Sequence, residues 1–291
     1  YSETGLHRGQ LEMLIRRDLG TRLSRLLRYA STSGDKFYRY GIMMSEVEQI
    51  MACIRAFNDE DNYKMIGELP LYIEKSTSFD IRALAQVRDF SALLEVLAKT
   101  PYADLIRPFS VTNMEDFDYT ACESVLRKYF YDQVMKIVDQ EFSGKVKKEI
   151  REIFLTQIEL DNITRIYRSK RYFNATPAQI KKVINPVYLR IPKRELEDMI
   201  DHCNAEEFME RLARSAYHNY LDSSNFAYIE YHAQSINYNL NKRHMMFSTN
   251  PDIVLIAYLV LSETEIQNVV DIIEGVRYGI PADKINRLLI Y

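Results

Sequence analysis

The sequence predicts an all-α protein in which one helical unit is used three times. Only nine of the 291 residues are glycine and eight are proline, so few residues interrupt a helix. Apolar residues recur at spacings of three and four along most of the chain, and no stretch alternates long enough to build a sheet. A short pattern occurs three times, which predicts approximate threefold internal symmetry.

The repeated pattern is a glutamate followed three positions later by an amide. It occurs as Glu46 with Gln49, Glu159 with Asn162, and Glu265 with Asn268. Each pair flanks an apolar stripe that the spacing places on one helix face. We expect the amide to be half-buried and bonded to a neighbouring helix, and the glutamate to stay hydrated. The six residues are therefore expected to hold each unit together rather than to touch a partner.

The elements of the first unit follow in order along the chain. Residues Leu6–Ala30 are predicted to form a long amphipathic helix that residues 31–34 end. The helix with Glu46 comes next and ends in the acidic turn Asn58–Asn62. The stretch Asp80–Leu105 is predicted to be helical again.

A second element occurs twice and supports the same repeat. The segment Asp89–Tyr102 resembles the segment Asn204–Tyr217, with leucine and alanine at matching positions. Asp89 and Asn204 are predicted N-caps of these helices. The two segments are separated by almost the same number of residues as Glu46 and Glu159. Two independent sequence elements that recur at nearly the same separation are unlikely to do so by chance.

These repeats divide the chain into three predicted units. Unit one covers residues 1–110, unit two covers residues 111–222, and unit three covers residues 223–291 and lacks the last element. The chain begins at Tyr1 rather than at methionine, so we expect the N-terminal part of unit one to be truncated.

Composition favours a soluble helical protein with no nucleic-acid role. The formal net charge is −3, which gives no reason to expect a nucleic acid partner. The longest apolar run, Ile253–Leu261, is about half the length of a membrane span. We therefore expect it in a core helix. The three cysteines are far apart and are predicted to be small buried side chains in a reducing compartment.

The sequence contains no recognisable catalytic, cofactor or metal motif. Residues Gly275–Gly279 lack the Gly-Lys-Ser/Thr end of a phosphate loop, so a helix terminus with glycine caps explains them better. Asp198 and His202 share a helix face beside Cys203, but two ligands without a third favour a salt-bridged histidine over a metal site. We expect no catalytic residue, no cofactor and no bound metal.

One basic cluster follows the second Glu–Asn helix directly. It consists of Arg168, Lys170 and Arg171. Cations at a helix C-terminus are favourable in any case, so a solvated face explains the cluster. The alternative is docking onto an acidic partner or an anionic membrane surface.

The C-terminal stretch from Pro251 to Ile285 resembles a known family. It contains Ala-Tyr-Leu at the end of an apolar run, then Glu265 and Asn268, then Gly275, Gly279, Pro281 and Ile285 in one order and spacing. This arrangement is similar to the C subunit of the V-type and A-type ATPases, whose eukaryotic equivalent is the d subunit. The resemblance extends over nearly the whole chain. The first repeat departs from it, with Gln49 in place of asparagine.

The resemblance implies a non-catalytic central-stalk component of a rotary ATPase. Such proteins form a funnel of three similar helical bundles around a pseudo-threefold axis. The funnel is a socket that couples the rotor shaft, made of the D and F subunits, to the membrane proteolipid ring. The complex transports protons or sodium ions with ATP, or synthesises ATP. The expected location is the cytoplasmic face of a membrane, as a peripheral protein, and the plasma membrane if the source is bacterial or archaeal.

A different class of function fits the residues less well. A helical-repeat scaffold that binds another protein would also lack catalytic motifs. Solenoid repeats usually have periods of about 20–50 residues. The period of this chain is more than twice as long, which favours the motor component.

Overall fold

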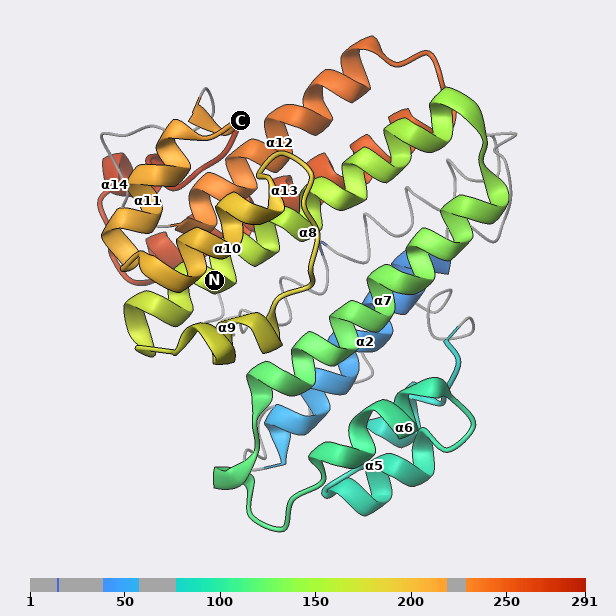
Figure 1. Cartoon of the computed structure of the whole chain (residues 1–291). Helices are drawn as coiled ribbons and strands as arrows, with labels where there is room; N and C mark the ends of the chain where they lie inside the picture. The colour runs from blue at the N-terminus through green and yellow to red at the C-terminus, as the bar shows by residue number, and fades with distance from the viewer. Residues whose placement is uncertain (1–14, 16–38, 58–76, 219–228) are drawn as a thin grey trace. The chain divides into compact units, whose positions relative to one another are not determined.

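The computed structural model describes residues 15, 39–57, 77–218 and 229–291 (Figure 1). Within these ranges the chain forms helices and connecting loops and no strand, which confirms the all-α prediction. The predicted helix Leu6–Ala30, its break and the acidic turn at 58–62 lie outside the described ranges, apart from residue 15. The chain divides into two compact units, Tyr1–Glu141 and Phe142–Tyr291. The three repeat boundaries and the funnel stay predictions.

The first compact unit is built on two long helices. Helix α2 (Arg39–Ala56) packs against α7 (Tyr119–Glu141) (Figure 1). The buried residues of both helices include residues at spacings of three and four. Along the chain, α2 and α7 are separated by the short helices α4 (Ile81–Leu84), α5 (Phe90–Val96) and α6 (Pro101–Ile106), and by the 3-10 turns η2 (Arg107–Phe109) and η3 (Met114–Asp116).

The stretch Asp80–Leu105 is helical, as predicted, and the structure divides it among three short helices. The side chains of Asp80 and Asp89 each accept backbone N–H groups at the start of a new helix. Pro101 occupies the first turn of α6, where its missing N–H and fixed φ favour a helix start. The predicted N-cap role of Asp89 is confirmed.

The second compact unit is arranged around α8 (Gly144–Tyr172). The remaining helices are α9 (Pro177–Val183), α10 (Lys193–His202), α11 (Ala205–Arg214), α12 (Ile229–Phe247), α13 (Pro251–Arg277) and α14 (Ala282–Asn286). Helix α8 packs against α9, α11, α12 and α13. Asn204 caps α11, and Glu207 returns a bond to the Asn204 backbone, so the predicted N-cap is confirmed as a full capping box.

Helix α13 contains the longest apolar run. By length and composition it could cross a membrane, and within the described residues it is the one helix that could. Its first turns are instead buried inside the unit, where Ile253, Ile256 and Ala257 are fully covered by protein. Helices α12 and α8 contact α13. The prediction of a core helix is therefore confirmed for this part of the run.

Candidate functional site

The second copy of the repeated motif is a buried carboxylate surrounded by donors. Glu159 lies in the middle of α8 and is completely buried. Its carboxylate accepts backbone N–H groups from Leu189 at 2.8 Å, Arg190 at 3.0 Å and Ile191 at 3.1 Å. The hydroxyl of Tyr217, at the end of the second repeated element, also donates to it at 2.6 Å. One side chain thus joins α8, a loop and the segment after α11.

The amide one turn further along α8 holds the start of the same loop. Asn162 Oδ1 accepts the backbone N–H of Asn185 at 2.9 Å, and Asn162 Nδ2 donates to the carbonyl of that residue. The prediction that the amide bonds a neighbouring helix is wrong, since its partner is the backbone of a loop. The reason is that a carboxamide presents an N–H donor beside a carbonyl acceptor, and these match the C=O and N–H of a single backbone residue.

The first copy in α2 repeats the carboxylate arrangement. Glu46 is buried, and its carboxylate accepts the backbone N–H of Ser78 and the hydroxyl of Tyr102 at 2.7 Å. Burial raises the pKa of Tyr102, and the adjacent Glu46 carboxylate raises it further, so the tyrosine stays a donor. Gln49 lies half-buried on the same helix. Tyr102 and Tyr217 therefore have the same role in two copies.

The third copy in α13 keeps the amide contact and differs at the carboxylate. Asn268 Nδ2 donates to the carbonyl of Ile290 at 2.7 Å, and Asn268 Oδ1 accepts its N–H at 3.0 Å. Glu265, by contrast, is exposed. The prediction of a hydrated glutamate is thus confirmed for Glu265 and wrong for Glu46 and Glu159. Burial is tolerated in those two copies because N–H and O–H donors replace water.

The glycines of the C-terminal motif have two different roles. Gly279 has φ of +65° and ends α13, with Ile280 N–H bonded to Gly275 O and Gly279 N–H bonded to Val276 O. This is a Schellman cap, which confirms the interpretation as a helix terminus for Gly279. Gly275 lies inside α13, where a Cβ would come within 2.5 Å of two side-chain carbons of Ile285. It permits close contact with α14, whose first residue follows Pro281.

We expect Gly275→Ala to destabilise the protein, although alanine favours a helix. The added methyl group must displace the buried Ile285, and overpacking of this kind costs about 1–3 kcal/mol. Gly41→Ala in α2 is the matched control, because nothing lies within 4 Å of its Cβ position. Gly41→Ala is expected to raise the free energy of unfolding by about 0.5–1 kcal/mol. Urea unfolding followed by circular dichroism measures the free energy of unfolding of both variants. A change of the same sign in both would contradict the proposed close contact.

Lys170 of the basic cluster is used inside the second unit. Its Nζ donates to the carbonyls of Ile200 at 2.7 Å and Cys203 at 2.6 Å, at the C-terminal end of α10. Partial burial lowers the pKa of Lys170. A cation at this position satisfies helix-end carbonyls and interacts favourably with the helix dipole.

The two arginines of the cluster make ion pairs and remain half exposed. Arg168 Nη1 lies 3.3 Å from a carboxylate oxygen of Glu230, and Arg171 is paired with Glu206. Their side chains are 53% and 49% exposed, so both can still reach solvent. Docking by this cluster stays a prediction, and a test of it must spare Lys170.

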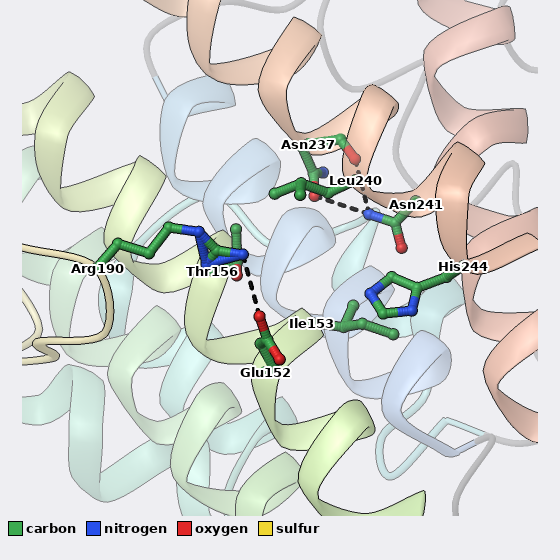
Figure 2. Close-up of a pocket in the computed structure, with 8 residues that line it drawn as sticks. All are labelled: Glu152, Ile153, Thr156, Arg190, Asn237, Leu240, Asn241 and His244. Carbon is green, nitrogen blue, oxygen red and sulfur yellow. Dashed lines mark hydrogen bonds and ion pairs between the residues drawn. The ribbon is translucent and has the colours of Figure 1, made fainter. Parts of the chain in front are cut away.

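A polar pocket lies between α8 and α12 beside Arg190 (Figure 2). Arg190 Nη2 is 3.1 Å from a Glu152 oxygen, and Nη1 donates to Thr156 Oγ1 at 3.4 Å. Across the pocket, the amide nitrogen of Asn241 bonds to Asn237, and its buried Oδ1 has no partner among the described residues. We expect an ordered water molecule in the pocket to donate a hydrogen bond to this buried acceptor.

The candidate metal ligands near α10 form a surface ion-pair group. His202 Nδ1 lies 3.2 Å from Asp198, and Asp198 also pairs with Arg211, which holds the pKa of the carboxyl below its usual range. Within the described ranges, no three histidine, cysteine or acidic side chains form a group that could hold a metal ion. Cys53 and Cys122 are buried thiols, and burial raises both pKa values to about 12.

The chain belongs to the family of the ATP synthase (C/AC39) subunit. The family model matches residues 1–288, which is nearly the whole chain. This agrees with the resemblance to the C and d subunits of the V-type and A-type ATPases. Members of the family are accessory components of the ATPase complex rather than its catalytic ones. No curated protein matches the chain significantly.

Proposed function

We propose that this protein is the central-stalk socket of a rotary ATPase, a non-catalytic part that seats the D–F shaft on the membrane proteolipid ring. The observation that carries the proposal is the family match over residues 1–288. ATP hydrolysis elsewhere turns the shaft, and the socket transmits the rotation to the ring. The ring moves protons or sodium ions, and reversal of the cycle synthesises ATP.

The buried motifs support a mechanical role. A part that transmits torque must deform little, and close-packed helices have low compressibility. In two copies a buried carboxylate ties a long helix to distant segments, Glu46 to Tyr102 and Glu159 to Tyr217. Hydrogen bonds to a charged group are stronger than neutral ones, so these contacts stiffen each compact unit.

The proposed location is the cytoplasmic face of a membrane, with peripheral contact only. The burial of the first half of α13 inside the second unit supports a peripheral rather than a spanning role. In a bacterium or an archaeon the membrane would be the plasma membrane. The proposed partners are the D and F subunits and the proteolipid ring.

Titration of the purified chain against the isolated D–F complex tests the proposal. Calorimetry should show saturable one-to-one binding. A binding face of at least the standard size, about 1,200–2,000 Å² in total, is expected because the joint must not slip under load. Absence of binding, both to D–F alone and to D–F in the presence of the solubilised ring, would contradict the socket role.

Charge reversal at Arg168 and Arg171 tests whether the basic cluster faces a partner. If it does, the double change to glutamate should weaken binding to the ring or to D–F about tenfold at low salt, and the effect should shrink as salt screens it. Reversal of Lys145 and Lys148, exposed at the start of α8, is the matched control. Unchanged affinity and salt dependence would assign the cluster to an internal contact.

A further inference from the structure

The end of α12 and the loop into α13 form a hairpin tip, residues 242–250, at one end of the second compact unit (Figure 1). Three consecutive apolar side chains of the hairpin tip are open to solvent, Met245 at 42%, Met246 at 66% and Phe247 at 76%. Lys242 and Arg243, in the preceding turn, are exposed as well. Successive side chains on a helix point about 100° apart, so exposure at five of the six positions 242–247 leaves this helix end open on most sides. The hairpin tip therefore projects from the unit and is not the wall of a groove.

The hairpin tip is held by its own hydrogen bonds. Asn250 Oδ1 accepts the N–H groups of Asp252 at 3.0 Å and Ile253 at 3.2 Å, which caps the start of α13. The Ser248 N–H donates to the carbonyl of His244 at 2.9 Å, and Ser248 Oγ accepts the N–H of Asn250 at 3.2 Å. The polar groups of the turn are thus satisfied locally, while the apolar side chains before it remain outside the core.

The charge of the hairpin tip is positive. Residues 231–251 contain no aspartate or glutamate, and Asp252, which follows them, is buried. Lys242 Nζ lies 5.5 Å from the centre of the Tyr238 ring. Within the described residues, neither Lys242 nor Arg243 is paired with a carboxylate. Both charges are therefore available to an anionic surface.

The start of α8 adds positive charge at the same end of the unit. Helix α8 runs antiparallel to α12, since its last turns pair with the start of α12 and its N-terminal part shares a pocket with His244 (Figure 2). Lys148 at this end is exposed, and Lys145 is 89% exposed although it pairs with Glu149 at 3.5 Å. Exposed apolar residues scattered singly over a surface need no explanation, but here they are consecutive and surrounded by cations.

We propose that the hairpin tip is a contact site for an anionic phospholipid surface. Met246 and Phe247 enter the boundary between headgroups and acyl chains, and the long side chains of Lys242 and Arg243 reach the headgroup phosphates from one turn behind. A lipid surface adapts to a projection of this kind, and anionic lipids of the cytoplasmic leaflet attract basic segments. The inference rests on the proposed peripheral location, to which it adds the residues and the lipid chemistry, and it does not require binding to D–F.

Co-sedimentation of the full chain with lipid vesicles tests this site. Vesicles of phosphatidylglycerol and phosphatidylcholine should bind the chain more tightly than phosphatidylcholine alone, and salt should weaken the binding. The double change Lys242→Gln and Arg243→Gln should lower the partition coefficient about 25-fold, which is about fivefold for each cation. The double change Lys182→Gln and Arg194→Gln is the matched control. It removes the same charge from exposed positions in α9 and α10, at the opposite end of α8, and should leave binding nearly unchanged.

A second measurement places the contact at the apolar residues. The chain contains no tryptophan, so Phe247→Trp supplies a single fluorescent reporter. Its emission should shift to shorter wavelength when anionic vesicles are added, because the indole leaves water. Tyr278→Trp, at a position that is 73% exposed just after the end of α13, is the control and should not shift.

Three results would overturn the proposal: unchanged emission at position 247 with anionic vesicles, a shift at position 278 alone, or equal vesicle binding by the Lys242→Gln and Arg243→Gln variant. A shift at position 247 with D–F but not with vesicles would assign the hairpin tip to a protein contact and would likewise contradict lipid binding. The D–F titration contains no lipid, so failure of the socket role and failure of this lipid contact are distinguishable.

Discussion

Glu159→Ala is expected to lower the free energy of unfolding by about 3–5 kcal/mol, the cost of breaking a buried charged contact. The change removes the acceptor for three backbone N–H groups and for the hydroxyl of Tyr217. Each buried donor that is left without a partner costs about 1–3 kcal/mol, and the cavity adds to this loss. The effect is large because one side chain joins three segments of the second unit.

The third copy supplies the matched control for this experiment. Glu265 occupies the equivalent position on α13 but is exposed, so Glu265→Ala should leave the free energy within about 0.5 kcal/mol of the native value. Tyr217→Phe should lie between the two, with a loss of about 1.5–3 kcal/mol from one bond to a charged group. Urea unfolding followed by circular dichroism gives all three values. Equal losses at Glu159 and Glu265 would mean that burial does not set the cost.

The sequence revealed the motif because its spacing is local. Glu159 and Asn162 lie one turn apart beside an apolar stripe, and a helical period can be read from such neighbours. Tyr217, one of the donors to Glu159, is 58 residues away, and no local pattern predicts a contact at that distance. A usable signal was nevertheless present. The second repeated element ends in Tyr102 and Tyr217, and its period nearly equals that of the glutamates, so pairing them was possible.

The burial of Glu46 and Glu159 cannot be predicted from the sequence, for a physical reason. Charged side chains are almost never fully buried unless they are paired, which made a hydrated Glu159 the natural expectation. The pairing here uses backbone N–H groups of the loop 189–191, and a sequence shows no sign of which amides lack a partner. Within residues 80–105 the sequence predicts the helix start at Asp89, and the structure adds a further cap at Asp80.

Asn162→Leu is expected to loosen the loop that carries the donors to Glu159. Both bonds to the Asn185 backbone are lost; the partly buried Asn185 N–H then has no partner among the described residues, whereas the Asn185 carbonyl still accepts the N–H of Val187. The expected loss in the free energy of unfolding is about 1–3 kcal/mol from one unsatisfied N–H group. Asn268→Leu, at the half-buried equivalent in α13, should cost less. Asn239→Leu on the exposed face of α12 is the surface control.

Hydrogen exchange gives the sharper readout for this last variant, because the contact is local. Amides of residues 189–191 should exchange faster in Asn162→Leu, while amides of α2 in the other compact unit should be unchanged. Thermal unfolding should shift down by several degrees in parallel. Unchanged exchange at 189–191 together with unchanged melting would show that Glu159 alone fixes the loop. In that case the shared spacing of glutamate and amide in the three copies would have to be explained by the helix face rather than by the loop.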